Sequence, residues 1–99
     1  MNIMKQSDGS KLTLALEGRL DTTTAPQLEA EFKSFLNGLT ELVLDFSQLD
    51  YLSSAGLRVI LSAQKAMNKQ GKMTVCHVNE TIMEIFEITG FVDILNIES

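Results

Sequence analysis

The stretch Glu41-Leu42-Val43-Leu44-Asp45-Phe46 decides the fold class. Its apolar centre is unbroken, which is typical of a strand covered on both faces, as in a parallel sheet. Residues 47–52 are then predicted to form a short loop, and a helical pattern begins near Ser53. A strand that leads into a helix and then another strand is a crossover connection. The stretch therefore indicates an α/β fold.

The same alternation extends toward the amino terminus. Leucines alternate with polar residues over 11–18, which predicts a half-buried strand, and the Asp8-Gly9 step predicts a hairpin to a short strand before it. Residues 21–26 predict a helix start, because a proline there is tolerated only in the first turn. The apolar stripe of this helix predicts a core contact, and Asn37-Gly38 ends it.

Toward the carboxyl terminus, the helix near Ser53 is followed by a predicted strand over 73–78. Asn79 can cap a third helix, which Gly90 ends, and residues 91–95 predict a final short strand. The chain thus predicts one α/β domain over residues 1–99. We expect a mixed, mostly parallel sheet of four to five strands with helices packed against it.

Composition and charge narrow the function class. The chain has 99 residues and a formal net charge of −5, with its lysines and arginines scattered singly. Nucleic acids and anionic membranes are bound by clustered basic residues, so we expect neither as a partner. The single cysteine, Cys76, excludes an internal disulfide, and no apolar run has the length of a signal peptide or a membrane span. We expect a soluble cytoplasmic protein.

Residues for catalysis or metal binding are sparse. His77 is the only histidine, and a strand-end position touching solvent or a backbone carbonyl is its expected role. The segment around Ser53 and Ser54 lacks the glycine that a nucleophile elbow places two residues before its serine. Cys76 and His77 are neighbours on a predicted strand, so their side chains should point to opposite faces and could not chelate one ion together. We expect no catalytic residues, no metal and no cofactor.

Three aspartates follow predicted strands. Asp21 follows one strand, while Asp45 and Asp50 follow another. The carboxyl ends of parallel strands gather at one edge of a sheet, where binding sites form, so we expect these carboxylates to flank the helix that starts near Ser53. Helix capping and turn formation would explain Asp21 and Asp50 equally well.

Two serines stand at the start of that helix. Ser53 is well placed as the N-cap, accepting the backbone N–H of Ala55 or Gly56, and Ser54 would be the first helical residue with its hydroxyl facing solvent. Two capping serines with no other role remain an alternative. A phosphate on Ser54 would meet the unpaired N–H groups and positive dipole of a helix N-terminus, so the fold should tolerate it.

The chain also resembles a known family, the STAS domain of bacterial anti-sigma-factor antagonists. The resemblance covers almost the whole length and rests on an ordered set of motifs: Gly18-Arg19-Leu20-Asp21, Leu42-Val43-Leu44-Asp45-Phe46-Ser47, Tyr51-Leu52-Ser53-Ser54-Ala55-Gly56-Leu57 and Gly90-Phe91. It implies a protein that binds an anti-sigma factor, itself a serine kinase with an ATP-binding fold, and so frees the sigma factor. It also implies phosphorylation just before the Gly-Leu pair, here at Ser54, and resetting by a metal-dependent serine phosphatase.

This chain departs from the family pattern on either side of Ser54. The family commonly has Asp where Ser53 stands, so Ser53 is a rival phosphosite, and Ser or Thr where Ala55 stands. The expected partner-binding surface comprises Asp21, Thr22, Thr23, Thr24, Asp45, Ser47, Asp50, Ser53, Ser54, Ala55, Gly56, Leu57 and Arg58. One alternative is a STAS scaffold or a sensor of small ligands such as nucleotides or lipids, without a sigma-factor role. Another is an enzyme with Ser54 as nucleophile, for which no base is placed.

Overall fold

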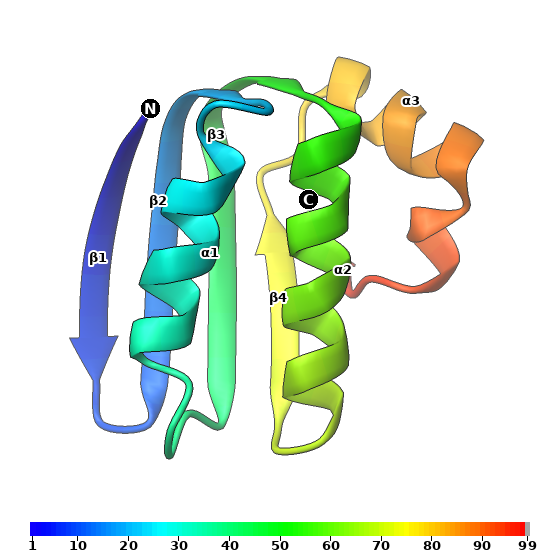
Figure 1. Cartoon of the computed structure of the whole chain (residues 1–99). Helices are drawn as coiled ribbons and strands as arrows, with labels where there is room; N and C mark the ends of the chain where they lie inside the picture. Colours follow the sequence, from blue (N-terminus) through cyan, green and yellow to red (C-terminus); the bar gives the residue numbers. More distant parts are fainter. Residues whose placement is uncertain (99) are drawn as a thin grey trace.

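The computed structural model describes residues 1–98 as one sheet with helices packed against it (Figure 1). The elements in chain order are β1 (Asn2–Asp8), β2 (Lys11–Leu20), α1 (Ala25–Ser34), β3 (Glu41–Leu52), α2 (Ser54–Asn68), β4 (Lys72–Cys76), α3 (Glu80–Thr89), the 3-10 helix η1 (Phe91–Asp93) and β5 (Ile97–Glu98). The strands lie in the order β1-β2-β3-β4-β5. Only β1 and β2 are antiparallel, so the predicted α/β class with a mixed, mostly parallel sheet is confirmed.

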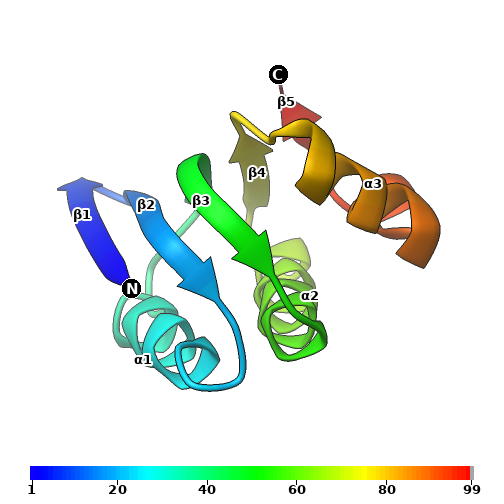
Figure 2. The ribbon, with the colours of Figure 1, turned by 90° about the horizontal axis from the view of Figure 1, so that it is seen from above.

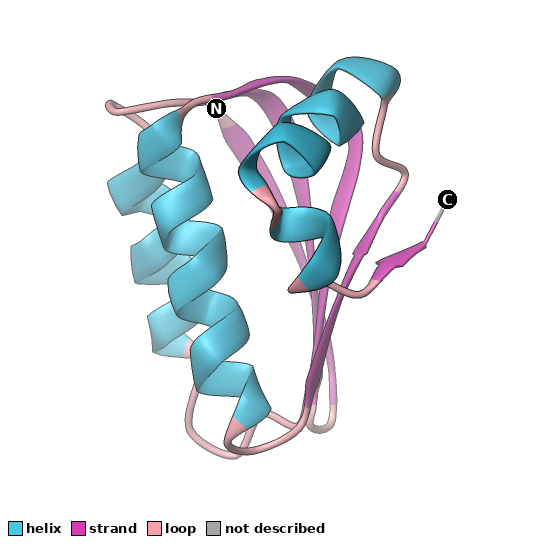
Figure 3. Ribbon diagram, turned by 90° about the vertical axis from the view of Figure 1, so that its right-hand side faces the viewer, coloured by secondary structure: helices cyan, strands magenta, loops and turns pink. Residues whose placement is uncertain are grey.

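The crossover helices α1, between β2 and β3, and α2, between β3 and β4, lie on the same face of the sheet. Figures 2 and 3 show α1 and α2 side by side on one face, with α3 beyond them at the β4–β5 end, while no helix of residues 1–98 covers the opposite face. Successive right-handed crossovers that advance in one direction place their helices on one side. The prediction that β3 is covered on both faces is therefore wrong: Leu44 is buried, whereas Val43 and Asp45 on the open face are half-buried.

The core lies between the sheet and the helices. Alternate residues of the three central strands point toward it, and each helix contributes one apolar stripe. Its most buried members are Leu12, Leu14, Leu16, Leu20, Leu42, Leu44, Phe46, Leu49, Leu52, Met73, Val75, Leu28, Phe32, Ile60, Met67, Ile82 and Phe86. Within residues 1–98, none of the helices has the length and apolar character needed to cross a membrane.

Strand β3 is twice as long as expected, since residues 47–52 continue it rather than forming a loop. They stay in register with β2 through two irregularities, between Ala15 and Glu17 and between Gly18 and Arg19. Such bulges change the alternation locally, so exposed Asp50 can stand between buried Leu49 and Leu52. As a result β3 reaches the start of α2, with only one residue between them.

The carboxyl-terminal part also differs from expectation. The predicted strand over 91–95 is wrong: the 3-10 helix η1 stands there, and β5 follows at Ile97–Glu98. Phe91 stacks on Phe86 with ring centroids 6.3 Å apart, so its side chain serves helix packing rather than a strand. The predicted end of α3 is confirmed, because Gly90 takes the left-handed conformation (φ 81°) that closes a helix.

Candidate functional site

The start of α2 is fixed by Ser53. Its backbone is extended (φ −96°, ψ 175°), and its Oγ accepts a hydrogen bond from the N–H of Gly56 at 3.4 Å. Its own N–H donates to the carbonyl of Leu20 at the end of β2, at 2.9 Å. The predicted N-cap role of Ser53 is confirmed, and its hydroxyl is occupied by the helix backbone.

Ser54 is the first residue of α2, and its side chain is exposed. The first turn of α2 holds no acidic residue, so no carboxylate of that turn offsets the positive end of the helix dipole. The N–H groups of a first helical turn have no acceptor within the helix. A negatively charged group on the Ser54 hydroxyl would therefore stand in a favourable field.

Gly56 lets α2 start close to the sheet. A Cβ at this position would lie 2.8 Å from both Leu20 Cγ and Leu52 Cδ1, which is closer than carbon atoms pack. Leu20 and Leu52 are register partners at the ends of β2 and β3. Because Gly56 has no side chain, the start of α2 can pack directly on the ends of β2 and β3. This contact sets the position of Ser54.

Asp21 organises the turn beside Ser53. Its Oδ1 accepts hydrogen bonds from the hydroxyl of Thr23 (2.7 Å) and from the N–H groups of Thr23 (3.0 Å) and Thr24 (3.2 Å). The Thr23 hydroxyl is the largest influence, and together these donors outweigh the cost of desolvation and lower the pKa of Asp21 below 3.8. Because Leu20 pairs with Leu52, this charged turn and Ser53 come side by side at one sheet edge.

Arg19 and Tyr51 join this edge, although we did not predict them as site residues. The guanidinium of Arg19 lies 4.2 Å from the centre of the Tyr51 ring, and its Nε lies 3.8 Å from Oδ2 of Asp21. They are register partners on β2 and β3. Their meeting depends on the continuation of β3 past residue 46, where we had expected a loop.

A groove between α1 and α2 opens next to the helix start. Its volume is about 260 Å³, and its lining residues are Thr22, Ala25, Pro26, Glu29, Ala55, Arg58 and Val59. The predicted residues Thr22, Ala55 and Arg58 therefore line one groove, and Ser54 is not among its lining residues. Leu57 is instead buried in the core, so its side chain supports the surface from beneath.

The other predicted residues of β3 divide into two groups. Ser47 and Asp50 are exposed on the extended part of the strand. Asp45 lies on the open face of the sheet, and β3 continues for seven residues beyond it. Over this span β2 advances only five residues, from Ala15 to Leu20, because the two bulges take up the extra residues of β3, so at about 3.3 Å per residue Asp45 lies about 17 Å before the end of the strand. The expectation that all three aspartates flank Ser54 is therefore wrong for Asp45.

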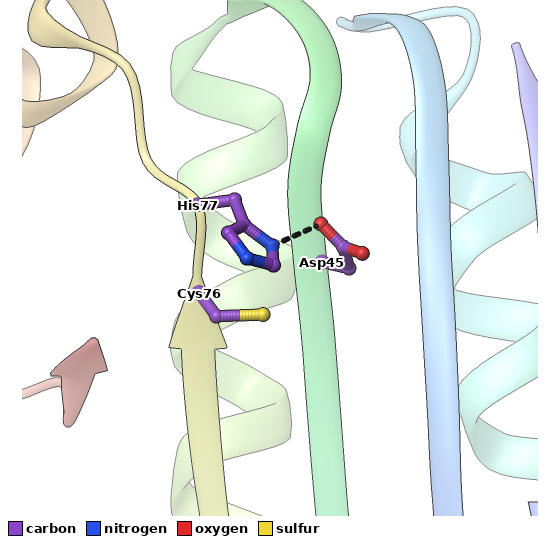
Figure 4. Close-up of side chains that lie close together, drawn as sticks. All are labelled: Asp45, Cys76 and His77. Atoms are coloured by element: carbon purple, nitrogen blue, oxygen red, sulfur yellow. Dashed lines mark hydrogen bonds and ion pairs between the residues drawn. The ribbon is translucent and has the colours of Figure 1, made fainter. Parts of the chain in front are cut away.

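Asp45 is instead grouped with Cys76 and His77 (Figure 4). The prediction that Cys76 and His77 point to opposite faces is wrong, because β4 ends at Cys76 and His77 takes a positive φ of 58°. Its Nδ1 lies 2.9 Å from Oδ1 of Asp45. One carboxylate oxygen, one imidazole nitrogen and the thiol sulfur all lie within 4.8 Å of one another.

The charges in this cluster influence each other. Burial opposes ionisation of Asp45, but hydrogen bonds from the Ser47 N–H and from His77 outweigh it and lower the pKa of Asp45. Burial, followed by the negative charges of Asp45 and Glu98, raises the pKa of the Cys76 thiol. His77 is thus held by a carboxylate of the sheet rather than by either serine of the helix start.

Comparison with known proteins places the chain in a family. The family model of the STAS domain matches residues 2–99. BtrV of Bordetella bronchiseptica, named as a predicted anti-sigma factor antagonist, is 41% identical over 92% of this chain and 79% of its own length. The anti-sigma-B factor antagonist of Listeria monocytogenes is 28% identical over 100% of this chain and 91% of its own length.

Solved structures agree in fold. The Bacillus cell fate determinant SpoIIAA in its phosphorylated form matches with a TM-score of 0.79, at 16% identity, over 99% of this chain and 92% of its own. SpoIIAA in its unphosphorylated form, described as an anti-sigma factor antagonist, matches with a TM-score of 0.80, at 15% identity, over 99% of this chain and 88% of its own.

Proposed function

This chain belongs to the STAS-domain family of anti-sigma factor antagonists, and from that premise we propose that it is a phosphorylation-switched binding protein. In the unphosphorylated state it binds an anti-sigma factor that is also a serine kinase with an ATP-binding fold, and so frees a sigma factor. Phosphorylation of Ser54 releases that partner, and a metal-dependent serine phosphatase restores binding. The protein works in the cytoplasm and is not itself an enzyme.

The observation that carries this proposal is the exposed Ser54 hydroxyl at the start of α2, next to a cap already made by Ser53. A kinase needs a hydroxyl that is accessible and free of a structural role. Ser53 is half-buried and its Oγ accepts from Gly56, so it is the poorer acceptor of phosphate. The phosphorylated form of SpoIIAA gives a precedent for such a modification on this fold.

The proposed binding surface surrounds that hydroxyl. It comprises the Asp21–Thr24 turn, Ser47 and Asp50 on β3, and residues 53–58 at the start of α2, with Arg19 and Tyr51 added at the sheet edge. Asp45 is left out, because it lies about 17 Å before the end of β3. A phosphoserine adds about −1.5 to −2 charges. That charge arrives close to Asp21, and a partner that meets this acidic edge with its own carboxylates would be repelled.

The test compares three variants for binding to the kinase-type anti-sigma factor of the same organism. Ser54→Ala should bind and stay bound when ATP is added. Ser54→Asp should bind at least about tenfold more weakly, because like charges brought together across an interface cost several kcal/mol. Ser53→Ala is the matched control and should still take up phosphate, as measured by intact mass. Equal affinities of Ser54→Ala and Ser54→Asp by calorimetry would overturn the proposal.

A sensor of small ligands is the second functional hypothesis for the same fold. The groove beside Ser54 has a volume of about 260 Å³, which is smaller than the pockets of about 300–1,000 Å³ that hold drug-sized ligands. A larger concavity of about 560 Å³ lies at the opposite end of the sheet, lined by Lys33, Leu36, Asn37, Gly38, Leu39, Thr40 and Gln70. It is an open surface depression far from Ser54, so partner binding is the better supported function.

A further inference from the structure

We propose that Asp45, Cys76 and His77 form a binding site for a divalent transition-metal ion of the zinc type, on the open face of the sheet. This site goes beyond the phosphorylation switch and does not depend on it. Its three ligand atoms come from two neighbouring strands, since Asp45 and Cys76 are register partners on β3 and β4. His77 follows directly after Cys76.

The backbone at His77 creates the cluster. In a regular strand, consecutive side chains point to opposite faces, which would carry the imidazole away from the thiol. Within residues 1–98, His77 is the one residue other than glycine with a positive φ, at 58°. This conformation turns the ring back over the face that holds Cys76, so imidazole, thiol and carboxylate converge (Figure 4). Histidine adopts the left-handed region more readily than most residues.

The distances suit a small ion. Zinc bonds nitrogen and oxygen at about 2.0–2.2 Å and sulfur at about 2.3 Å, so donors around a tetrahedral ion stand about 3.3–3.7 Å apart. The three donor atoms here lie within 4.8 Å of one another, and the Asp45–His77 pair is 2.9 Å apart. Small side-chain rotations would complete the tetrahedral geometry. They would move the Asp45 oxygen and the His77 nitrogen about half an ångström further apart and bring the Cys76 sulfur closer to both.

The donor set selects the class of metal. Thiolate and imidazole are ligands of zinc and its transition-metal neighbours, whereas magnesium and calcium prefer oxygen alone. Three protein ligands leave a fourth position for water, as in open zinc sites. The side chain of His77 is 57% exposed and that of Asp45 is 25% exposed, so an ion can reach the cluster from solvent.

The surrounding charge also favours a cation. Asp45 and Glu98 both lie near the Cys76 sulfur, and Glu98 is its register partner on β5. On binding, the thiol proton leaves to solvent, the sulfur donates an electron pair to the ion, and His77 coordinates through Nδ1 while Nε2 carries its proton. The ion then replaces the Asp45–His77 hydrogen bond and joins β3 to the end of β4.

The test uses the full chain purified without a histidine tag, because a tag would bind the same metals. Zn²⁺ is titrated by calorimetry, and Co²⁺ serves as a spectroscopic probe whose thiolate charge-transfer band appears only when sulfur is bound. We expect one ion per chain, the cobalt band, and a rise in melting temperature on adding Zn²⁺.

Three single variants locate the site, each with a conservative replacement. Cys76→Ser removes the thiolate, Asp45→Asn removes the charge, and His77→Asn removes the imidazole while keeping a residue that tolerates a positive φ. Each should weaken Zn²⁺ binding at least about 100-fold, since even outer-shell partners of metal ligands cost 10–100-fold.

Asp93→Asn, an exposed acid on η1, is the control and should bind as the unmodified protein does. Circular dichroism of each variant establishes that it is folded. Absence of the cobalt band, or Zn²⁺ affinity that Cys76→Ser retains in folded form, would overturn the site.

Discussion

The N-termini of helices α2 and α3 are built in similar ways but differ at three positions. Each follows a strand or its extension, and each is capped by a polar side chain that accepts the N–H three residues on. Ser53 caps α2 at 3.4 Å, whereas Asn79 caps α3 at 2.8 Å and also donates its Nδ2 to the Leu49 carbonyl at 3.0 Å. The start of α3 is thus tied to β3 through the cap itself.

The positions after the caps show a second contrast. The first helical residue is Ser54 in α2 and Glu80 in α3, so only α3 has its own carboxylate at the positive end of its dipole. Three residues after the cap stand Gly56 in α2 and buried Ile82 in α3. The start of α2 therefore packs directly on the strand ends. It also lacks the negative charge that Glu80 supplies at the start of α3.

The largest expected effect is a difference in the free energy of unfolding between variants of the two caps. Asn79→Ala loses the cap and leaves the Leu49 carbonyl without its donor, so we expect a loss of about 2 kcal/mol in the free energy of unfolding. Ser53→Ala loses a longer bond and should cost about 0.5–1 kcal/mol. Urea denaturation followed by circular dichroism measures both. Equal losses, or a greater loss for Ser53→Ala, would contradict the difference drawn between the caps.

Gly56→Ala tests the close seating of α2. The added methyl would meet Leu20 and Leu52 at 2.8 Å. Overpacking costs about 1–3 kcal/mol, while alanine improves helix propensity over glycine by about 1 kcal/mol, so a net destabilisation of about 1 kcal/mol is expected. Ser62→Ala, at an exposed position of the same helix, is the control and should be neutral or slightly stabilising. A stabilised Gly56→Ala protein would mean that α2 has more room at its start.

The charge difference is tested by a reciprocal exchange. Ser54→Asp should stabilise the fold by about 0.3–1 kcal/mol through the helix dipole, and Glu80→Gln should destabilise it by a similar amount. Both effects should shrink as salt is raised, because exposed charges are screened. Thermal unfolding at low and high ionic strength measures them. Loss of stability in Ser54→Asp would argue against a helix start that tolerates phosphate.

The smallest expected effect concerns Asp21, for which α3 has no counterpart at its start. Its folded pKa lies below the unfolded value of 3.8, so its stabilising contribution is complete above that value and is lost as pH falls through the folded pKa. Thr23→Val removes the hydroxyl that acts most on this carboxylate and should move the pKa upward. Carboxyl NMR titration measures the shift. Thr22→Val is the matched control, and an equal shift in both variants would sink the assignment to Thr23.

The order of elements and the cap of α2 could be predicted because they depend on local sequence. Ser53 and Asn79 are strong N-cap types directly before apolar periodic segments, and Gly90 is a usual helix stop. These signals need no knowledge of distant residues. The exposed position of Ser54 followed from the same reasoning.

The parts that were wrong depend on pairing between distant segments. We expected a loop over residues 47–52, where Ser47, Gln48 and Asp50 interrupt the apolar run of β3, yet pairing with β2 keeps this segment in a strand. The meeting of Arg19 with Tyr51 requires that register, as does the separation of Asp45 from Ser54. The cluster of Cys76 and His77 depends on one backbone angle that the sequence does not mark.

The hydrogen bond from the Ser53 N–H to the Leu20 carbonyl holds the start of α2 as part of the sheet edge. Together with the close packing of Gly56 on Leu20 and Leu52, it holds the start of α2 against the ends of β2 and β3. A modification at Ser54 would accordingly alter the surface charge that a partner contacts and leave the backbone conformation unchanged. The partner would therefore distinguish the two states of the domain by their charge at this site, and the domain itself would not need to change its conformation.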